Sequence, residues 1–501
     1  MDIAQNFQEK KDTYFNSFLK SILSHKFESI LLLLTIIGLV LKFFYFIRIE
    51  LNSDMVLSGI MSIEFSKYHN YFFSSYYMSA ADSNIFEVVT FYLLPQILSH
   101  FDPVILKVTA FFVFLLIVIV FSYIIFFSTK SLFNTLFFSA LLSNWYTSYA
   151  MVTHETTILV IGILLILYLF KPVKNWDIIF LVILTIVTFS DSLISIWFTI
   201  PFLISNLLKR PLKEQITSFL KFDIVFKTVF LSIIVTIFKY YFIEYYVRGT
   251  YTQCRELSCL INFQIPLLLK DLPSSISLIL YRIENNQITF IGILFIAFLI
   301  AYMILLIKNF KSISEKNMIL FVGVMSIFTS LFYLMTGAPE GSERYLKFIL
   351  IGLLSIFCMV DFSKSKYPKW ILLGIIIINL IYIINVPIIN SPNEEQYQLI
   401  DFLKKSNLSF GYGDYWDSNI ITYLSHEEVI IRAVSLENGL TPYYWNSAKR
   451  WYENPPKKFF VIVRDNNEKA LNYYYNIYVY KPIQITDYKN YKIFEYNMSG
   501  A

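Results

Sequence analysis

Charge is scarce in this sequence: Asp, Glu, Lys and Arg make up only 15% of its 501 residues, whereas 56% are hydrophobic. A soluble globular chain carries roughly a quarter charged residues, so an ordinary soluble protein is excluded. A helix needs about 20 apolar residues to cross a bilayer, and long apolar runs recur along the chain. The composition predicts a polytopic α-helical membrane protein whose charges concentrate in loops and in a water-exposed domain.

Several chemical motifs are missing as well. The five histidines are scattered and no HExxH occurs, which argues against a zinc enzyme, and no metal site is predicted. No Gly-x-Ser-x-Gly elbow, Gly-rich phosphate loop or nucleic-acid-binding module is present, so a nucleic acid partner is not expected. The first residues lack the short apolar core and cleavage site of a removed signal, so we expect the first apolar run to be retained.

Apolar runs separated by charges predict about eleven spans, at residues 30–48, 104–127, 132–150, 156–171, 177–190, 192–208, 223–245, 288–307, 317–335, 346–362 and 370–389. An odd number places the two termini on opposite sides, although the weak spans near 156–208 could change the count by two. Short loops on the N-terminal side hold about 17 Lys and Arg, against about 6 on the other side. We therefore expect a multi-pass protein of the cell (inner) membrane with a cytoplasmic N-terminal segment, residues 1–29.

Three segments on the opposite side of the transmembrane domain, residues 30–390, are longer than connectors need to be. Residues 49–103 hold two amphipathic segments, and residues 246–287 hold one, that are too polar to span and should lie at the membrane surface. Residues 391–501 should form a small periplasmic or extracellular α/β domain. Its predicted elements are a helix at 393–406, strands at 427–436 and 457–465, a helix at 466–477 and a strand at 490–497.

The stretch after the first span is the most informative for chemistry. Arg48, Glu50 and Asp54 lie there, directly before an amphipathic segment. A carboxylate fixed at the end of a rigid helix and half shielded from water suits a general base or a charge stabiliser. The alternative is that Asp54 only caps the following helix, as Asp often does before an apolar run.

Other polar residues recur at the outer ends of predicted spans, which suggests a shared cavity. His154 and Glu155 open one span, and Asp191 interrupts an apolar stretch. An acid in so hydrophobic a setting is costly and marks a candidate functional site. The alternatives are a capped turn for Asp191 and an interfacial hydrogen-bonding role for His154.

Arg344 lies in an outer loop, GAPEGSERYL, that enters a late span. Its guanidinium offers a planar set of donors that matches phosphate oxygens, so a lipid phosphate or diphosphate is its expected partner, with Arg48 and Tyr345 as further candidates. An ion pair with Glu340 or Glu343, or a phospholipid head group, stays open as the alternative.

Aromatic residues and two cysteines complete the set of candidates. Trp416, Trp445 and Trp451 stand among carboxylate and amide groups in the last domain, as a saccharide surface needs. The domain core and docking onto the membrane part explain them equally well. Cys254 and Cys259 share an outer loop, where either a disulfide or two free thiols are consistent with the sequence.

Together these features resemble the GT-C superfamily of integral-membrane glycosyltransferases, such as protein mannosyltransferases and O-antigen glucosyltransferases. The likeness covers nearly the whole chain as architecture. As motif it rests on SDMVLSGI after the first span, the two amphipathic segments behind it, SDSL at the outer end of a later span and SERYL near the last spans.

The resemblance implies a polyprenyl-phosphate-linked sugar as donor and a hydroxyl of a glycan, lipid or protein as acceptor. Asp54 would deprotonate or orient that hydroxyl, and Arg344 would hold the carrier phosphate. His154, Glu155 and Asp191 would line the cavity. Many members have Asp-Glu in the first loop, whereas Met55 follows Asp54 here, which leaves Glu50 as a second candidate base. No cofactor is required by the sequence, and dependence on Mg²⁺ or Mn²⁺ stays open.

Two other classes of membrane protein compete with this interpretation. An O-antigen polymerase or ligase would place its largest outer loop between late spans, whereas the largest outer mass here is terminal. A flippase for lipid-linked saccharides, or another transporter, would carry more polar residues in mid-span. A non-catalytic scaffold that reads glycans through its last domain is a further alternative.

Overall fold

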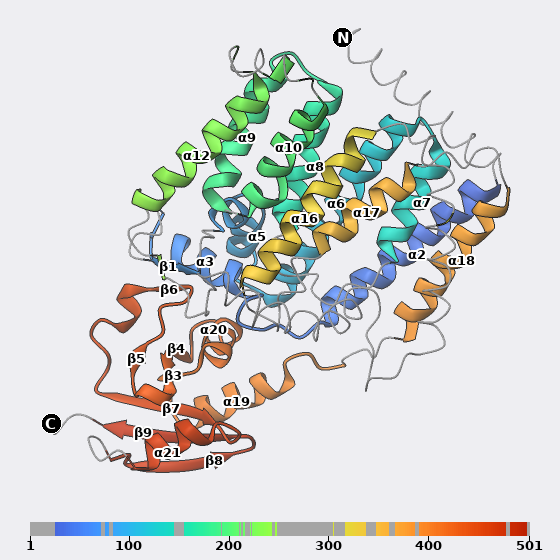
Figure 1. Cartoon of the computed structure of the whole chain (residues 1–501). Helices are drawn as coiled ribbons and strands as arrows, with labels where there is room; N and C mark the ends of the chain where they lie inside the picture. The colour runs from blue at the N-terminus through green and yellow to red at the C-terminus, as the bar shows by residue number, and fades with distance from the viewer. Residues whose placement is uncertain are drawn as a thin grey trace, which may run out of the picture.

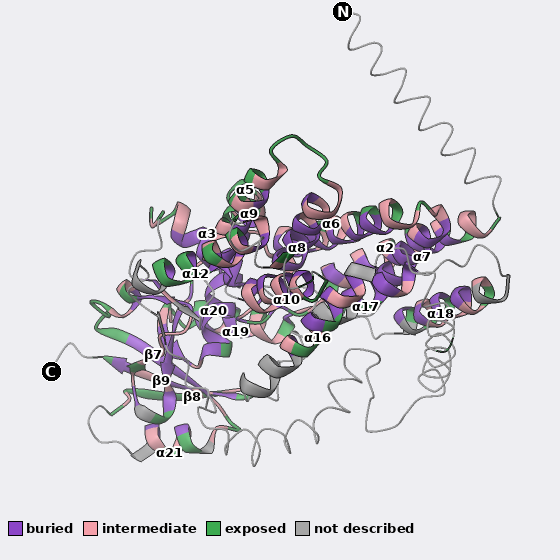
Figure 2. Ribbon diagram, turned by 45° about the horizontal axis from the view of Figure 1, so that its top comes forward, coloured by how far each residue is buried: buried purple, intermediate pink, exposed green. Residues whose placement is uncertain are grey.

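The structure is a computed structural model. It describes residues 26–71, 76–79, 84–144, 155–191, 193–209, 223–242, 246–247, 316–336, 347–359, 366–385, 390–476 and 481–497, with single positions or pairs at 211, 214–215, 221 and 304. It consists of a helical bundle followed by a C-terminal α/β domain, which lies against the end of the bundle near α3 and β1 (Figure 1). Buried residues are concentrated inside the bundle and in the strands of the C-terminal sheet (Figure 2).

The bundle consists of helices that coincide with the predicted apolar runs. They are α2 (Lys26–Arg48), α6 (Pro103–Thr129), α7 (Leu132–Ser143), α8 (Glu155–Phe170), α9 (Trp176–Ser190), α10 (Ile200–Lys209), α12 (Ile224–Phe242), α16 (Lys316–Thr336), α17 (Lys347–Cys358) and α18 (Lys366–Asn385). A π-helical turn, Ser195–Thr199, leads into α10. The predicted span at 288–307 falls almost entirely outside the described residues.

Two helices of the described chain are long and apolar enough to cross a membrane, namely α2 with 23 residues and α6 with 27. Helices α7, α8 and α9 have 12, 16 and 15 residues, fewer than the roughly 20 that a bilayer requires. The structure therefore confirms a mainly helical chain with strands near the C-terminus. The count of about eleven spans stays a prediction.

Local sequence explains where the longest helix begins and ends. The side chain of Asp102 accepts a hydrogen bond from Val104 N at 2.7 Å, and Pro103 occupies the first turn of α6, where its missing N–H costs nothing. Lys130 adopts a left-handed conformation after the last turn. Ser131 then caps α7 by accepting from Asn134 N at 3.2 Å. This tight connection lets α6 and α7 pack as neighbours.

The first loop contains both predicted amphipathic helices. They are α3 (Leu57–Ser66) and a composite helix made of α4 (Ile85–Glu87), a π-helical stretch (Val88–Tyr92) and α5 (Leu93–Leu98). Strand β1 (Tyr76–Ser79) lies between them and pairs with β2 (Tyr246–Val247) and with β6 (Ser447–Ala448). A small three-stranded sheet thus joins the first loop, the second loop and the C-terminal domain.

The C-terminal domain is a six-stranded mixed sheet covered on both faces. Its strands are β3 (Phe410–Gly413), β4 (Ile430–Ser435), β5 (Thr441–Pro442), β7 (Lys458–Arg464), β8 (Gln484–Tyr488) and β9 (Tyr491–Asn497), in the order β5-β4-β3-β7-β9-β8. Strand β3 runs parallel to β4 and β7, whereas β5, β8 and β9 run antiparallel to their neighbours. All five elements predicted for residues 391–501 are present. Strands β3, β5, β6 and β8 and helix α20 were not predicted.

Alternation along β7 places Phe460 and Ile462 toward α19 (Glu394–Lys405) and α20 (Tyr415–Leu424), and Val461 and Val463 toward α21 (Glu468–Asn476). The first of these two clusters continues into the core of the helical bundle. Domain and bundle therefore share one apolar core on that side of the sheet.

Candidate active site between the first loop and the C-terminal domain

Asp54 lies in the turn between α2 and α3 and is half-buried. Its Oδ1 accepts a hydrogen bond from the hydroxyl of Tyr415, at the start of α20, at 2.6 Å. The N-cap position of α3 is Val56, which makes no side-chain cap, and the amide oxygen of Asn52 accepts from Met55 N. Asp54 thus joins the C-terminal domain and does not occupy the N-cap position that the alternative interpretation expected.

The backbone directly before Asp54 is held by the same domain at two positions. Asn393 forms a reciprocal pair with Leu51, accepting from its N–H at 2.9 Å and donating to its carbonyl at 2.8 Å. The hydroxyl of Ser53 donates to the carbonyl of Trp416 at 2.8 Å. Three hydrogen bonds to the domain, at Leu51 and Ser53, therefore fix the segment that leads into Asp54.

Tyr415 is itself held by neighbours from two parts of the chain. The amide of Asn446 donates to its hydroxyl oxygen in a long hydrogen bond of 3.5 Å, and Tyr76 of β1 donates to the carbonyl of Asn446 at 3.0 Å. Burial, followed by the negative charge of Asp54, raises the pKa of Tyr415 well above its ordinary value. Tyr415 therefore stays protonated and remains a donor to Asp54.

A second group of contacts, formed by Glu64, Trp451, Arg450 and Tyr68 and called here the Glu64 cluster, lies near the C-terminal end of α3. Glu64 is buried and accepts hydrogen bonds from the indole N–H of Trp451 at 2.6 Å and from the guanidinium of Arg450, whose Nε lies 3.3 Å from Oε2. Arg450 also stacks on the ring of Tyr68, with 3.5 Å between the guanidinium carbon and the ring centre. This cluster fastens the domain to α3.

The three tryptophans proposed to bind the acceptor differ in position. Trp451 is only 6% exposed and donates a hydrogen bond to Glu64. Its position therefore fits the alternative in which it docks the domain onto the rest of the protein. Trp416 is 54% exposed and lies beside the ring of Tyr415, with 5.3 Å between ring centres. Trp445 is half-buried in the segment that follows β5. Trp416 is thus the tryptophan with the most surface to offer near Asp54.

A buried carboxylate cluster lies between the first loop and the bundle. Glu87 of α4 accepts from the hydroxyls of Ser58 and Thr156 at 3.1 and 3.0 Å. Asp191, at the end of α9, accepts from Thr157 at 2.5 Å and from Leu193 N at 2.9 Å. Both acids are about 95% buried, and consecutive threonines of α8 reach them.

Glu87 was not predicted as a site residue, although it lies in a segment expected to be amphipathic. A carboxylate within the apolar run IFEVVTFYLL is the same signal that singled out Asp191. Glu155 opens α8 beside this cluster and is half-buried. Ser58, one turn after Asp54 along the chain, links this cluster to α3 through its hydrogen bond to Glu87.

The remaining predicted residues lie elsewhere. Arg48 and Glu50 are exposed at the end of α2. Five candidates fall outside the described residues: His154, Cys254, Cys259, Arg344 and Tyr345. Within the part of the chain that the structure describes, no group of three or more His, Cys, Asp or Glu residues could hold a metal ion.

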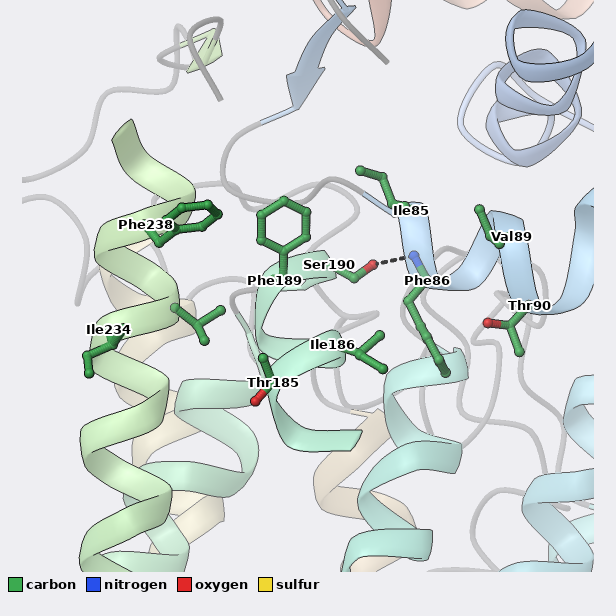
Figure 3. A pocket seen from close by; sticks show the side chains of 11 residues that line it. Ile85, Phe86, Val89, Thr90, Thr185, Ile186, Phe189, Ser190, Ile234 and Phe238 are labelled. Carbon is green, nitrogen blue, oxygen red and sulfur yellow. Dashed lines mark hydrogen bonds between the residues drawn. The ribbon is translucent and has the colours of Figure 1, made fainter. Parts of the chain in front are cut away.

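An apolar groove of about 550 Å³ opens beside the carboxylate cluster (Figure 3). It is bounded by the α4 region, α9 and α12, and the residues lining it are Ile85, Phe86, Val89, Thr90, Thr185, Ile186, Phe189, Ser190, Ile234, Val235 and Phe238. Ser190 closes one wall by accepting from Phe86 N at 2.9 Å. The acids Glu87 and Asp191 each directly follow a lining residue, so an apolar channel adjoins buried polar groups.

Comparisons of this chain with protein-family models, with curated proteins and with solved structures gave no match. The functional assignment therefore rests on the residues and the geometry described above.

Proposed function

We propose that this protein is a membrane-embedded glycosyltransferase of the GT-C type. It would transfer a sugar from a polyprenyl-phosphate carrier to a hydroxyl of a glycan, lipid or protein on the outer face of the cell membrane. The observation that carries the proposal is Asp54: a half-buried carboxylate, held by Tyr415 in a turn clamped between two domains, with the exposed ring of Trp416 close by.

The surface of the bundle supports a location in the membrane. Large apolar side chains are exposed along α2, α6, α9, α12 and α18, among them Val40, Phe44, Phe112, Ile119, Val182, Ile233, Ile237 and Ile381. Soluble proteins rarely expose contiguous apolar surface on this scale. With lipid around these helices, the basic loops would be cytoplasmic and the C-terminal domain would lie outside.

In this reaction Asp54 acts as the base. The acceptor hydroxyl gives its proton to the Asp54 carboxylate while its oxygen forms a bond to the anomeric carbon of the sugar. The bond between that carbon and the phosphate oxygen breaks, and the carrier leaves as polyprenyl phosphate. Arg344 would hold the phosphate through its planar donors.

The groove and the carboxylate cluster fit the two ends of such a donor. The groove offers an apolar wall of aliphatic and aromatic side chains for an isoprenoid chain. Glu87, Asp191 and the threonines of α8 supply hydrogen-bonding groups beside it that suit sugar hydroxyls.

The test is transfer of radiolabelled sugar from a panel of polyprenyl-phosphate sugars, in membranes that contain the wild-type protein or Asp54→Asn, with extracted cell-surface glycan as acceptor. We expect transfer by the wild type and none by Asp54→Asn, because the amide cannot accept the proton. Glu50→Gln tests the second candidate base, and this variant should stay active because Glu50 is exposed after α2 whereas Tyr415 bonds Asp54. Wild-type turnover by Asp54→Asn would refute the assignment of the base. Absence of transfer from every donor would favour polymerisation or transport.

A further inference from the structure

Tyr415 of the C-terminal domain contacts the carboxylate of the proposed base, Asp54. Tyr415 is the second residue after β3, and Asp414 caps the helix that Tyr415 begins by accepting from Asp417 N at 2.9 Å. The strand and the capped helix fix the backbone of Tyr415, and its ring packs against Trp416 and Tyr443, with centre separations of 5.3 and 6.0 Å. Its hydroxyl therefore has little freedom to leave Asp54.

The partner group is equally constrained. The segment directly before Asp54 is held by Asn393, which bonds the backbone of Leu51, and by the carbonyl of Trp416, which accepts from Ser53. A hydrogen bond of 2.6 Å between two fixed backbones sets the plane of the carboxylate, because it fixes the position of Oδ1. Setting that plane also sets the direction in which both oxygens present their lone pairs.

We propose that Tyr415 is a positioning residue for the base: the C-terminal domain completes the active site by orienting the carboxylate of Asp54 through the hydroxyl of Tyr415. The domain thus contributes to the chemical step and is more than a platform for the acceptor. This inference rests on the proposed function, since it concerns the same carboxylate.

A base that is misplaced by a fraction of an ångström loses rate, because proton transfer requires near-ideal alignment of the reacting atoms. The donor binds through other residues in this scheme. Loss of the Tyr415 hydroxyl should therefore lower kcat and leave the KM for the donor nearly unchanged.

The chain supplies a matched control. Tyr423, on the same helix α20, donates its hydroxyl to Oε1 of Gln96 at 2.7 Å. That bond also joins the C-terminal domain to the first loop and is also buried. It differs from the Tyr415 bond in having no contact with Asp54, so a purely structural effect of losing a hydroxyl at this junction should appear in both variants.

The experiment compares Tyr415→Phe with Tyr423→Phe in the full-length protein. The membranes are supplied with the labelled polyprenyl-phosphate sugar that the wild type uses in the panel described above. We expect kcat to fall about 10- to 100-fold in Tyr415→Phe, with the KM for the donor within about twofold of the wild type. Tyr423→Phe should keep both constants within about twofold. Melting temperatures of both variants in detergent should remain close to each other.

Three results would count against the proposal. Wild-type kcat in Tyr415→Phe refutes it, and so does an equal loss of kcat in the two tyrosine variants. If Asp54→Asn is inactive in either case, the proposed function survives and only the role of Tyr415 fails. If Asp54→Asn retains full activity, the base assignment fails and the role of Tyr415 fails with it.

Discussion

Trp451 donates its indole N–H to Glu64 at 2.6 Å, and the two residues are 387 positions apart in the sequence. Glu64 belongs to the first loop, whereas Trp451 lies near the middle of the C-terminal domain. Arg432 stacks on the Trp451 ring, with its guanidinium carbon 4.2 Å from the ring centre. A buried acid on one short helix thus receives donors from a separate domain.

Removal of Glu64 should loosen the domain. We expect Glu64→Ala to lower the free energy of unfolding by about 2 to 3 kcal/mol, because hydrogen bonds to a charged group are lost and buried donors are left without their acceptor. Thermal melting in detergent and limited proteolysis of the domain measure this. Lys404→Ala is the control, since both side chains of its ion pair with Glu428 are exposed and the pair should contribute little to stability. Equal melting of the two variants would contradict the docking role.

Asp414 should make stability depend on pH. Burial, with a further contribution from the charge of Asp417, raises the pKa of Asp414 from 3.8 to about 6. The folded state therefore binds this proton more tightly than the unfolded chain. Its contribution to stability is fully present below about pH 4 and is lost as the pH rises through about 6.

Asp414→Asn should consequently raise stability at pH 7, by about 1 to 3 kcal/mol. The amide oxygen can still accept from Asp417 N and cap α20. Melting temperatures of wild type and variant, measured from pH 4 to pH 8, test this. We expect the two curves to converge toward pH 4, and curves that stay parallel throughout would contradict the prediction.

Gly59 permits close approach of α3 and α20. A Cβ atom at this position would lie 2.3 Å from the ring of Tyr423, which is fully buried and cannot move aside. Gly59→Ala should therefore destabilise the protein by about 1 to 3 kcal/mol through overpacking. In contrast, Gly323→Ala on α16 meets no atom within 4 Å and should be neutral or stabilising by up to about 1 kcal/mol. Thermal melting of the two variants tests this prediction, and the melting temperature of Gly59→Ala should be the lower of the two.

Filling the apolar groove should affect the carrier lipid specifically. Ile234→Trp adds bulk to a residue that lines the groove. The isoprenoid chain would lose part of its apolar contact there, which is worth about 1 to 2 kcal/mol of binding free energy. The KM for a long-chain polyprenyl donor should therefore rise by about tenfold. A donor with a short, water-soluble chain should be used unchanged. Ile233→Trp, at the neighbouring exposed position of α12, is the control. Equal effects on both donors would show that the groove does not hold the chain.

The helices were predictable because apolar runs of sufficient length leave few other conformations. The α/β character of the last domain was predictable from short β-branched and aromatic runs such as KFFVIVR, which forms β7. Strand β3 was missed because its sequence, FGYG, holds two glycines, which weaken a strand signal. Gly411 is needed where Phe460 packs against the strand, and Gly413 where Ile462 does.

The site was predictable only in part. Asp54 was found because its position after a span is visible locally. Its partner Tyr415 is 361 positions away, and no local pattern reports a contact of that range. For Trp451, acceptor binding and docking were both left open, because the sequence does not show that its indole bonds a buried Glu64. Side chains at the junction of two domains acquire their roles only when the domains meet.

The three-stranded sheet sets an order of events during synthesis of the protein. Tyr76 lies in β1, and its hydroxyl bonds to the carbonyl of Asn446, 370 residues later. Because β6 follows directly at Ser447–Ala448, β1 cannot acquire this neighbour until nearly nine-tenths of the chain has left the ribosome. Under the proposed function, the helices that line the groove are made long before Tyr415 can reach Asp54. A nascent chain, or one truncated before Tyr415, would then hold donor without transferring its sugar.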